Sequence, residues 1–166
     1  SSTSSNDSRI TSVGKIIRKF KIDELSQLFN VFIGNMSIVG PRPQIIDHVL
    51  NKYSDEEKKL LTVRPGITDF SSIVFSDEGE ILKLSKDPDT DYNLLIRPWK
   101  SRLGLLYIKT RTNKIDLFLI LLTIIAIFSK KKALYFLNKL LKKINAPENL
   151  VSVSKRENRL KPSTPP

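Results

Sequence analysis

Several residue types that build common functional sites are missing or scarce in this chain of 166 residues. It has no cysteine, which excludes disulfide bonds, thiolate metal sites and a cysteine nucleophile. It has one histidine, His48, which excludes a histidine-rich metal site, and a Ser-His-Asp triad would have to use that residue. Apolar residues make up 40% of the chain, so a folded domain with a modest core is expected.

Most of the net basic charge of the chain lies in one segment. The net charge is +11, but residues 1–108 carry 15 basic and 14 acidic side chains, whereas residues 109–146 carry nine basic and one acidic. A basic segment of this kind binds nucleic acid or an anionic membrane surface, or only keeps the protein soluble.

The same segment contains the most apolar run of the chain, residues 117–128, in which only Thr123 is polar. A helix of this length measures about 18 Å, which is too short for the roughly 30 Å core of a bilayer. We therefore expect it to be buried in protein or to dip into lipid.

Residues 129–146 are predicted to form a basic amphipathic helix of the kind that lies in a membrane interface. Tyr135 and Phe136 are its only aromatic residues, which is few for stacking on bases, so the prediction includes no nucleic-acid partner. The alternative for the whole segment is a core helix followed by a solvated helix. The apolar face of the predicted amphipathic helix is Leu134, Leu137, Leu140, Leu141 and Ile144.

The patterns elsewhere predict an α+β fold, a mainly helical single domain with short β elements. Helix is expected over 12–33, with a break near Lys21 and an end at Gly34-Asn35, then over 44–61 and 97–108. In the predicted helix 44–61, residues 55–59, which include Glu57, are expected to point outward. We expect disorder in 1–8, loops or turns at 34–43, 62–69 and 80–93, short β-pairing at 70–75, and a flexible end at 147–166.

Two neighbouring carboxylates, Asp23 and Glu24, stand at a predicted helix start. The helix dipole favours their ionised form there, which suits a nucleophile or a metal ligand. Adjacent helix positions point in different directions, so one could face a substrate and the other a cation. The alternative is structural: Asp23 caps the helix and Glu24 complements the dipole.

Two arginines accompany these acids in the sequence. Arg18 precedes them on the predicted helix, and Arg42 stands between Pro41 and Pro43 in a rigid loop. Guanidinium groups fixed in this way bind phosphate through paired N–H donors, although both could simply be solvated. Two acids with two arginines are typical of phosphoryl transfer, in which Mg²⁺ neutralises a diphosphate.

Several motifs together resemble one family. The runs RITSVG at 9–14, DEL at 23–25, GNMS at 34–37, VGPRP at 39–43 and VRPGIT at 63–68 resemble the bacterial sugar transferases, the monotopic phosphoglycosyl transferases. Leu106-Tyr107 and Asp116 resemble its closing segment, so the similarity spans residues 9–128 as a catalytic domain.

The resemblance implies a membrane-associated, monotopic enzyme at the cytoplasmic face of the bacterial inner membrane. Such enzymes transfer a sugar-1-phosphate from a UDP-sugar to polyprenol phosphate and release UMP. By resemblance Asp23 is the covalent nucleophile and Glu24 the Mg²⁺ ligand. Arg18 and Arg42 contact phosphate in a loop shaped by Pro41 and Pro43. The donor, the lipid acceptor and the membrane surface are the implied partners, and a second copy of the chain is a further candidate.

The chain departs from the family pattern at several places. Ser26 replaces a proline, Asn35 replaces an aspartate, and residues 69–78 differ from the usual sequence after the PGIT turn. Residues 1–8 do not resemble the membrane helix that precedes RIT in the family. The alternative function is therefore a truncated, catalytically weak, membrane-peripheral binding module.

Overall fold

The computed structural model describes Thr11, Gly14 and residues 27–43 and 53–166. In this part the fold is mainly helical with one two-stranded sheet, as expected for the predicted α+β class. The strands are β1 (Ser37–Val39) and β2 (Gly66–Thr68). The shorter helical elements are α2 (Gln27–Phe32), α4 (Asp55–Lys58), the 3₁₀ turn η2 (Lys59–Thr62), α5 (Phe70–Val74), α6 (Glu78–Ile81), α7 (Pro88–Asp91) and the π-helical turn η3 (Tyr92–Ile96). The longer helices are α8 (Arg97–Thr110), α9 (Asn113–Phe128), α10 (Lys130–Lys143) and α11 (Glu148–Lys155).

The two strands pair in parallel and fix the loop that follows β1. Ser37 is in register with Gly66 and Val39 with Thr68. Beyond the strand the backbones of Gly40 and Gly66 touch, and a Cβ on Gly66 would lie 2.1 Å from the amide nitrogen of Gly40. The predicted loop at 34–43 and turn at 62–69 thus each contain a three-residue strand, too short to show an alternating pattern.

Residues 70–75 do not form the predicted β-pairing, because Phe70–Val74 form α5. Asp69 caps this helix and accepts a hydrogen bond from the backbone N–H of Ser72 at 2.7 Å. Phe70, Ile73 and Val74 are buried at helical spacing. The prediction was wrong because it gave more weight to the apolar residues than to the capping signal Asp69-Phe70-Ser71-Ser72.

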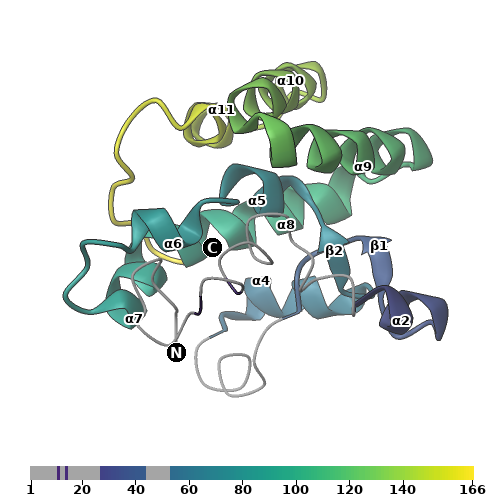
Figure 1. The fold of residues 1–166 in the computed structure, drawn as a ribbon, viewed down its shortest axis with the longest axis horizontal. Coiled ribbons are helices and arrows are strands. Elements are labelled where there is room, and N and C mark those ends of the chain that lie inside the picture. The colour runs from purple at the N-terminus through teal and green to yellow at the C-terminus, as the bar shows by residue number, and fades with distance from the viewer. Residues whose placement is uncertain (1–10, 12–13, 15–26, 44–52) are drawn as a thin grey trace.

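Helix α5 lies at the centre of the core, between α8 and the pair α9–α10 (Figure 1). The predicted helix at 97–108 is confirmed as α8, and the apolar run 117–128 lies within α9. Helix α10 packs on both α9 and α11, and the three form the upper layer in Figure 1. A hydroxyl pair joins this layer to the sheet, since the oxygens of Thr68 and Thr123 are 2.6 Å apart.

The predicted loop at 80–93 is instead partly helical. Asp87 caps α7 and Pro88 occupies its first turn, and the chain then passes through η3 into α8. In the segment predicted as a flexible end, Glu148–Lys155 form α11. The chain after α11 passes back along α8, where Arg102 donates to the carbonyl of Thr164 at 2.8 Å.

Glu57 is fully buried, although the sequence analysis expected it to point outward. It accepts hydrogen bonds from Nε of Arg97 at 3.2 Å and from the hydroxyl of Ser101 at 2.6 Å. It also completes a capping box with Ser54 at the start of α4. This buried ion pair attaches α4 to the first turns of α8.

Helix α9 is buried on one face only. Ile115, Leu119 and Leu122 belong to the core, whereas Leu117 and Phe128 are 60% and 81% exposed. No helix in the described ranges combines the length and the apolar content needed to cross a bilayer.

Candidate active site

A cavity of about 210 Å³ lies between the loop after β1 and helix α8. Residues 41–43 form one wall, η2 and the residues beside it form a second, and Asp69 and Ser71 at the start of α5 also line the cavity. The lining combines apolar side chains with four charged ones, Arg42, Asp69, Arg97 and Lys100. The lining residues are Pro41, Arg42, Pro43, Tyr53, Leu60, Leu61, Val63, Pro65, Asp69, Ser71, Tyr92, Arg97, Lys100, Ser101 and Gly104.

Arg42 is held in this cavity by its neighbours in the chain. Pro41 is buried, and its carbonyl accepts a hydrogen bond from the backbone N–H of Gly66 at 2.9 Å. Pro43 restricts the backbone on the other side, because its ring fixes φ and disfavours a helical conformation at Arg42. The guanidinium group is therefore carried by a short loop with little freedom, directly after the sheet.

Lys100 and Arg97 on α8 add positive charge to the lining. Lys100 forms an ion pair with Glu78, and Arg97 is paired with Glu57. Burial alone would lower the pKa of Lys100, but Tyr92 and Glu78 together outweigh it and raise the pKa, so the ammonium stays charged. An anionic ligand at this lining would share both cations with the carboxylates that already pair with them.

Asp69 is the carboxylate inside the lining, and it is fully buried. Burial raises its pKa, although hydrogen bonds from the backbone and hydroxyl of Ser72 and from the hydroxyl of Ser71 act in the opposite direction. Gly104 faces this carboxylate, because a Cβ built there would lie 3.9 Å from Oδ2 of Asp69. The same Cβ would meet the side chain of Leu60 at 2.8 Å, so glycine keeps this part of the cavity open.

The raised pKa of Asp69 predicts a pH dependence of stability. A carboxyl whose pKa is raised by folding binds more protons in the folded state, so stability falls as pH rises above the unfolded value of 3.8. In Asp69→Asn the amide oxygen can keep the three hydrogen bonds to Oδ1, but the group does not titrate. We expect the stability of the wild type relative to Asp69→Asn to decrease between pH 4 and pH 7, measured by urea unfolding. If the difference in unfolding free energy between the wild type and Asp69→Asn stayed constant or grew with pH, the raised pKa of Asp69 would be contradicted.

Three of the predicted site residues, which are consecutive in the chain, lie at the cavity. Arg42, Pro41 and Pro43 line one cavity. Asp23, Glu24 and Arg18 lie outside the described residues. Within the described part, no group of three or more histidine, aspartate or glutamate side chains could hold a metal ion.

Sequence reasoning missed Asp69, Arg97 and Lys100 as lining residues. A capping signal could have identified Asp69, because two serines follow it closely. No local signal distinguishes Arg97 and Lys100 from other basic residues of a helix. Their positions depend on partners distant in the sequence, Glu57 at 40 positions from Arg97 and Glu78 at 22 positions from Lys100.

The family described as bacterial sugar transferase matches residues 1–130 of this chain. This range contains every element from α2 to α9, so the whole cavity lies inside it. Helix α10 begins where the match ends, and α11 lies beyond it.

Curated relatives match shorter stretches. The undecaprenyl-phosphate galactose phosphotransferase of Salmonella typhimurium is 54% identical over 63 residues, 38% of this chain and 13% of that protein. The UDP-glucose:undecaprenyl-phosphate glucose-1-phosphate transferase of Klebsiella pneumoniae is 42% identical over 104 residues, 60% of this chain and 22% of the relative. The galactosyl transferase CpsE of Streptococcus agalactiae is 46% identical over 83 residues, 48% of this chain and 18% of the relative. The chain thus matches less than a quarter of the length of each of these three proteins.

Proposed function

Because this chain belongs to the bacterial sugar transferase family, we propose that it transfers a sugar-1-phosphate from a UDP-sugar to polyprenol phosphate. This reaction would begin the assembly of a surface polysaccharide or glycoconjugate. The names of the relatives support it, because they describe transfer of galactose phosphate or glucose-1-phosphate to undecaprenyl phosphate.

The observation that carries the proposal is the position of Arg42. The loop at 41–43 presents this guanidinium to a cavity that also contains Arg97 and Lys100. A diphosphate fits these surroundings, because guanidinium groups donate paired hydrogen bonds to phosphate oxygens. Burial and the nearby Glu57 raise the pKa of Tyr53 to about 12, so its phenol stays a neutral hydrogen-bond donor at the same cavity.

The proposed chemistry has two steps. A carboxylate oxygen of Asp23 attacks the β-phosphorus of the UDP-sugar, the bond from that phosphorus to the bridging oxygen breaks, and UMP leaves with the electron pair. A phosphate oxygen of the polyprenol phosphate then attacks the same phosphorus and releases the Asp23 carboxylate. The product is a polyprenyl diphosphate sugar.

Mg²⁺ would be held by Glu24, whose carboxylate is the type of oxygen ligand this ion prefers. When bound, the ion would neutralise charge on the diphosphate. Asp69 is a poor second ligand because its Oδ1 already accepts three hydrogen bonds and its Oδ2 accepts one from Ser71. Glu24 and the diphosphate oxygens themselves are thus the proposed partners of the ion.

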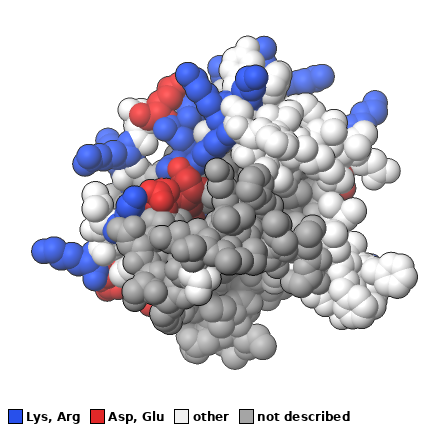
Figure 2. Space-filling model, viewed as in Figure 1, with Lys and Arg blue, Asp and Glu red and all other residues white. Residues whose placement is uncertain are grey.

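We further propose that the protein lies on the cytoplasmic face of the inner membrane through an apolar surface formed by α2, β1 and α9. This surface is Phe29 and Phe32 of α2, Ile33 directly after it, Ile38 of β1, and Leu117, Leu121, Ile124 and Phe128 of α9, all of them exposed. Helices α2 and α9 both contact β1. The right side of the molecule, where Figure 1 places these three elements, carries few charged side chains in Figure 2. Exposed apolar patches of this kind mark membrane or protein contacts.

Arg42 provides a test of the proposed reaction. Replacing it with alanine is expected to lower the rate of UMP release by about 100-fold or more, because a charge-assisted contact to the transferring phosphate is lost. Arg42→Lys should recover only part of the rate, since an ammonium lacks the paired donors of a guanidinium. The measurement is UMP release by the protein as its gene encodes it, with UDP-glucose or UDP-galactose, Mg²⁺ and vesicles containing polyprenol phosphate.

Arg159→Ala is the matched control, because Arg159 is an exposed arginine outside the lining of the cavity and outside the matched family region. It should keep its rate within about twofold, as expected for a surface substitution. Equal rates in Arg42→Ala and the wild type would contradict the proposal. A protein that binds membranes and UDP-sugars but releases no UMP with any donor would favour the alternative, a catalytically weak membrane-peripheral module.

A further inference from the structure

We propose that a groove between α9 and α10 binds one anionic phospholipid of the bilayer, with the headgroup against three lysines and an acyl chain along an apolar floor. The inference rests on the membrane association in the proposed function, but not on the transfer reaction. The groove has a volume of about 580 Å³ and is separate from the cavity that contains Arg42. Its lining is Thr112, Lys114, Ile115, Phe118, Phe136, Lys139, Leu140, Lys143 and Ile144.

Both helices contribute apolar residues to the floor of the groove. Ile115 and Phe118 come from α9, Phe136 and Leu140 come from α10, and Ile144 directly follows α10. Phe136 remains 40% exposed although it is a large aromatic residue. An acyl chain lying here would remove this surface from water at about 25 cal/mol per Å².

The groove is continuous with the proposed membrane-facing surface of α9. Residues three positions apart are neighbours on a helix surface. Leu117 therefore lies beside Lys114, and Leu121 lies beside Phe118. Leu117 and Leu121 are 60% and 50% exposed. A lipid could therefore pass from the bilayer into the groove without leaving apolar surroundings.

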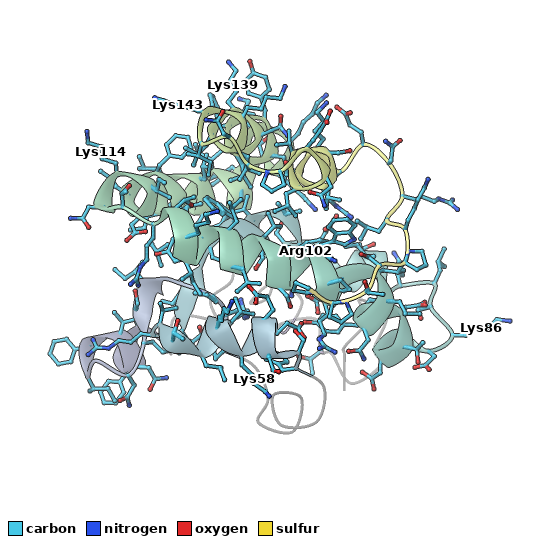
Figure 3. The ribbon with its side chains drawn as sticks, turned by 180° about the vertical axis from the view of Figure 1, so that it is seen from behind. Lys58, Lys86, Arg102, Lys114, Lys139 and Lys143 are labelled. Atoms are coloured by element: carbon cyan, nitrogen blue, oxygen red, sulfur yellow. The ribbon has the colours of Figure 1, made fainter. Side chains whose placement is uncertain are left out.

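Three lysines stand at the rim. Figure 3 shows Lys114 at the start of α9 and Lys139 and Lys143 on α10, all on the same side and far from Lys58 and Lys86. No carboxylate lines the groove, and no ion pair to any of the three occurs in the part of the chain that the structure describes. The start of α9, a helix of 16 residues capped by Thr112, adds partial positive charge at this end.

The apolar floor together with the three lysines favours a phospholipid over a free phosphate as the ligand. An inorganic phosphate could satisfy the lysines but would leave the apolar floor in contact with water. An amphiphile with an anionic headgroup satisfies both. Because α10 begins at Lys130, where the family match ends, one wall of the groove comes from outside the matched region.

The test compares two triple variants of the protein as its gene encodes it. Lys114→Gln, Lys139→Gln and Lys143→Gln together remove the lysines of the groove. Lys131→Gln, Lys132→Gln and Lys142→Gln remove the same charge from exposed positions of α10 outside the groove. Binding is measured by cosedimentation with vesicles of phosphatidylcholine, with and without phosphatidylglycerol.

We expect the groove variant to lose on the order of 100-fold in affinity for phosphatidylglycerol vesicles, about fivefold for each lysine, and the control to lose clearly less. Native mass spectrometry should show one dioctanoyl phosphatidylglycerol on the wild type and the control but none on the groove variant. Phe136→Ser, with all lysines kept, should weaken lipid binding and leave any binding of inorganic phosphate unchanged.

Equal losses in the two triple variants would overturn the groove while leaving membrane association intact, because they would indicate diffuse attraction. Inorganic phosphate that binds as tightly as the lipid would overturn the choice of ligand. If the wild type fails to bind phosphatidylglycerol vesicles, the membrane placement in the proposed function is wrong, and the groove proposal fails with it.

Discussion

Replacing Asp23 with asparagine is expected to lower the transfer rate by at least about 1,000-fold, because an amide cannot form the covalent bond to phosphorus that the proposed first step requires. The substitution keeps nearly the same shape and can still accept a hydrogen bond, so the fold should be preserved. The measurement is UMP release with the donor that supports the highest rate, followed in the wild type and the variant at equal protein concentration.

Asp55→Asn is the matched control, because Asp55 is an exposed carboxylate at the start of α4 and pairs only on the surface with Lys58. Its rate should stay within about twofold of the wild type. If Asp23→Asn kept a tenth or more of the wild-type rate, Asp23 would not be the nucleophile, since removal of an attacking group costs far more than tenfold.

Replacing Glu57 with glutamine is expected to lower the free energy of unfolding by about 3–5 kcal/mol, the effect of breaking a buried ion pair. Glu57 has no exposed surface and Arg97 is only 8% exposed. The variant removes the carboxylate partner of Arg97. It also replaces one of the two oxygens by an NH₂ group, so either the hydrogen bond from Ser101 to Oε1 or the one from Ser54 to Oε2 is lost. Urea unfolding followed by circular dichroism measures the change.

The neighbouring Glu56→Gln is the control for Glu57. Glu56 pairs with Lys59 on the surface, where both side chains are at least half exposed, so the loss should be below about 1 kcal/mol. Combining Glu57→Gln with Arg97→Gln should cost less than the sum of the two single changes, because both single changes break the same ion pair. If Glu57→Gln and Glu56→Gln lowered the free energy of unfolding equally, and if the losses of Glu57→Gln and Arg97→Gln were additive, the ion pair would not join α4 to α8 as described.

The long helices could be predicted from the sequence because their own residues determine them. The apolar run at 117–128 and the spaced leucines of 133–144 are strong local signals, and both segments are helical in the structure. The end of the helix before Gly34 was also predictable, since Gly34 has φ of +84°, a conformation that glycine adopts without strain.

Features that depend on distant partners could not be predicted. Glu57 is surrounded in the sequence by charged residues that point to solvent, and only its pairing with Arg97, 40 positions later, explains its burial. Helix α11 follows Pro147 in a stretch rich in proline, and it is held by its packing on α10. Likewise Lys100 joins Arg42 at the cavity only because α8 packs beside the loop at 41–43.

The most direct test of the proposed function is the intact mass of the protein after mixing with UDP-sugar and Mg²⁺ in the absence of polyprenol phosphate. The account predicts a mass increase equal to one phosphosugar, located at Asp23 by peptide mapping, which disappears when polyprenol phosphate is added and does not form in Asp23→Asn. UMP release and product formation by the wild type with no such adduct, or with the adduct on another residue, would contradict it.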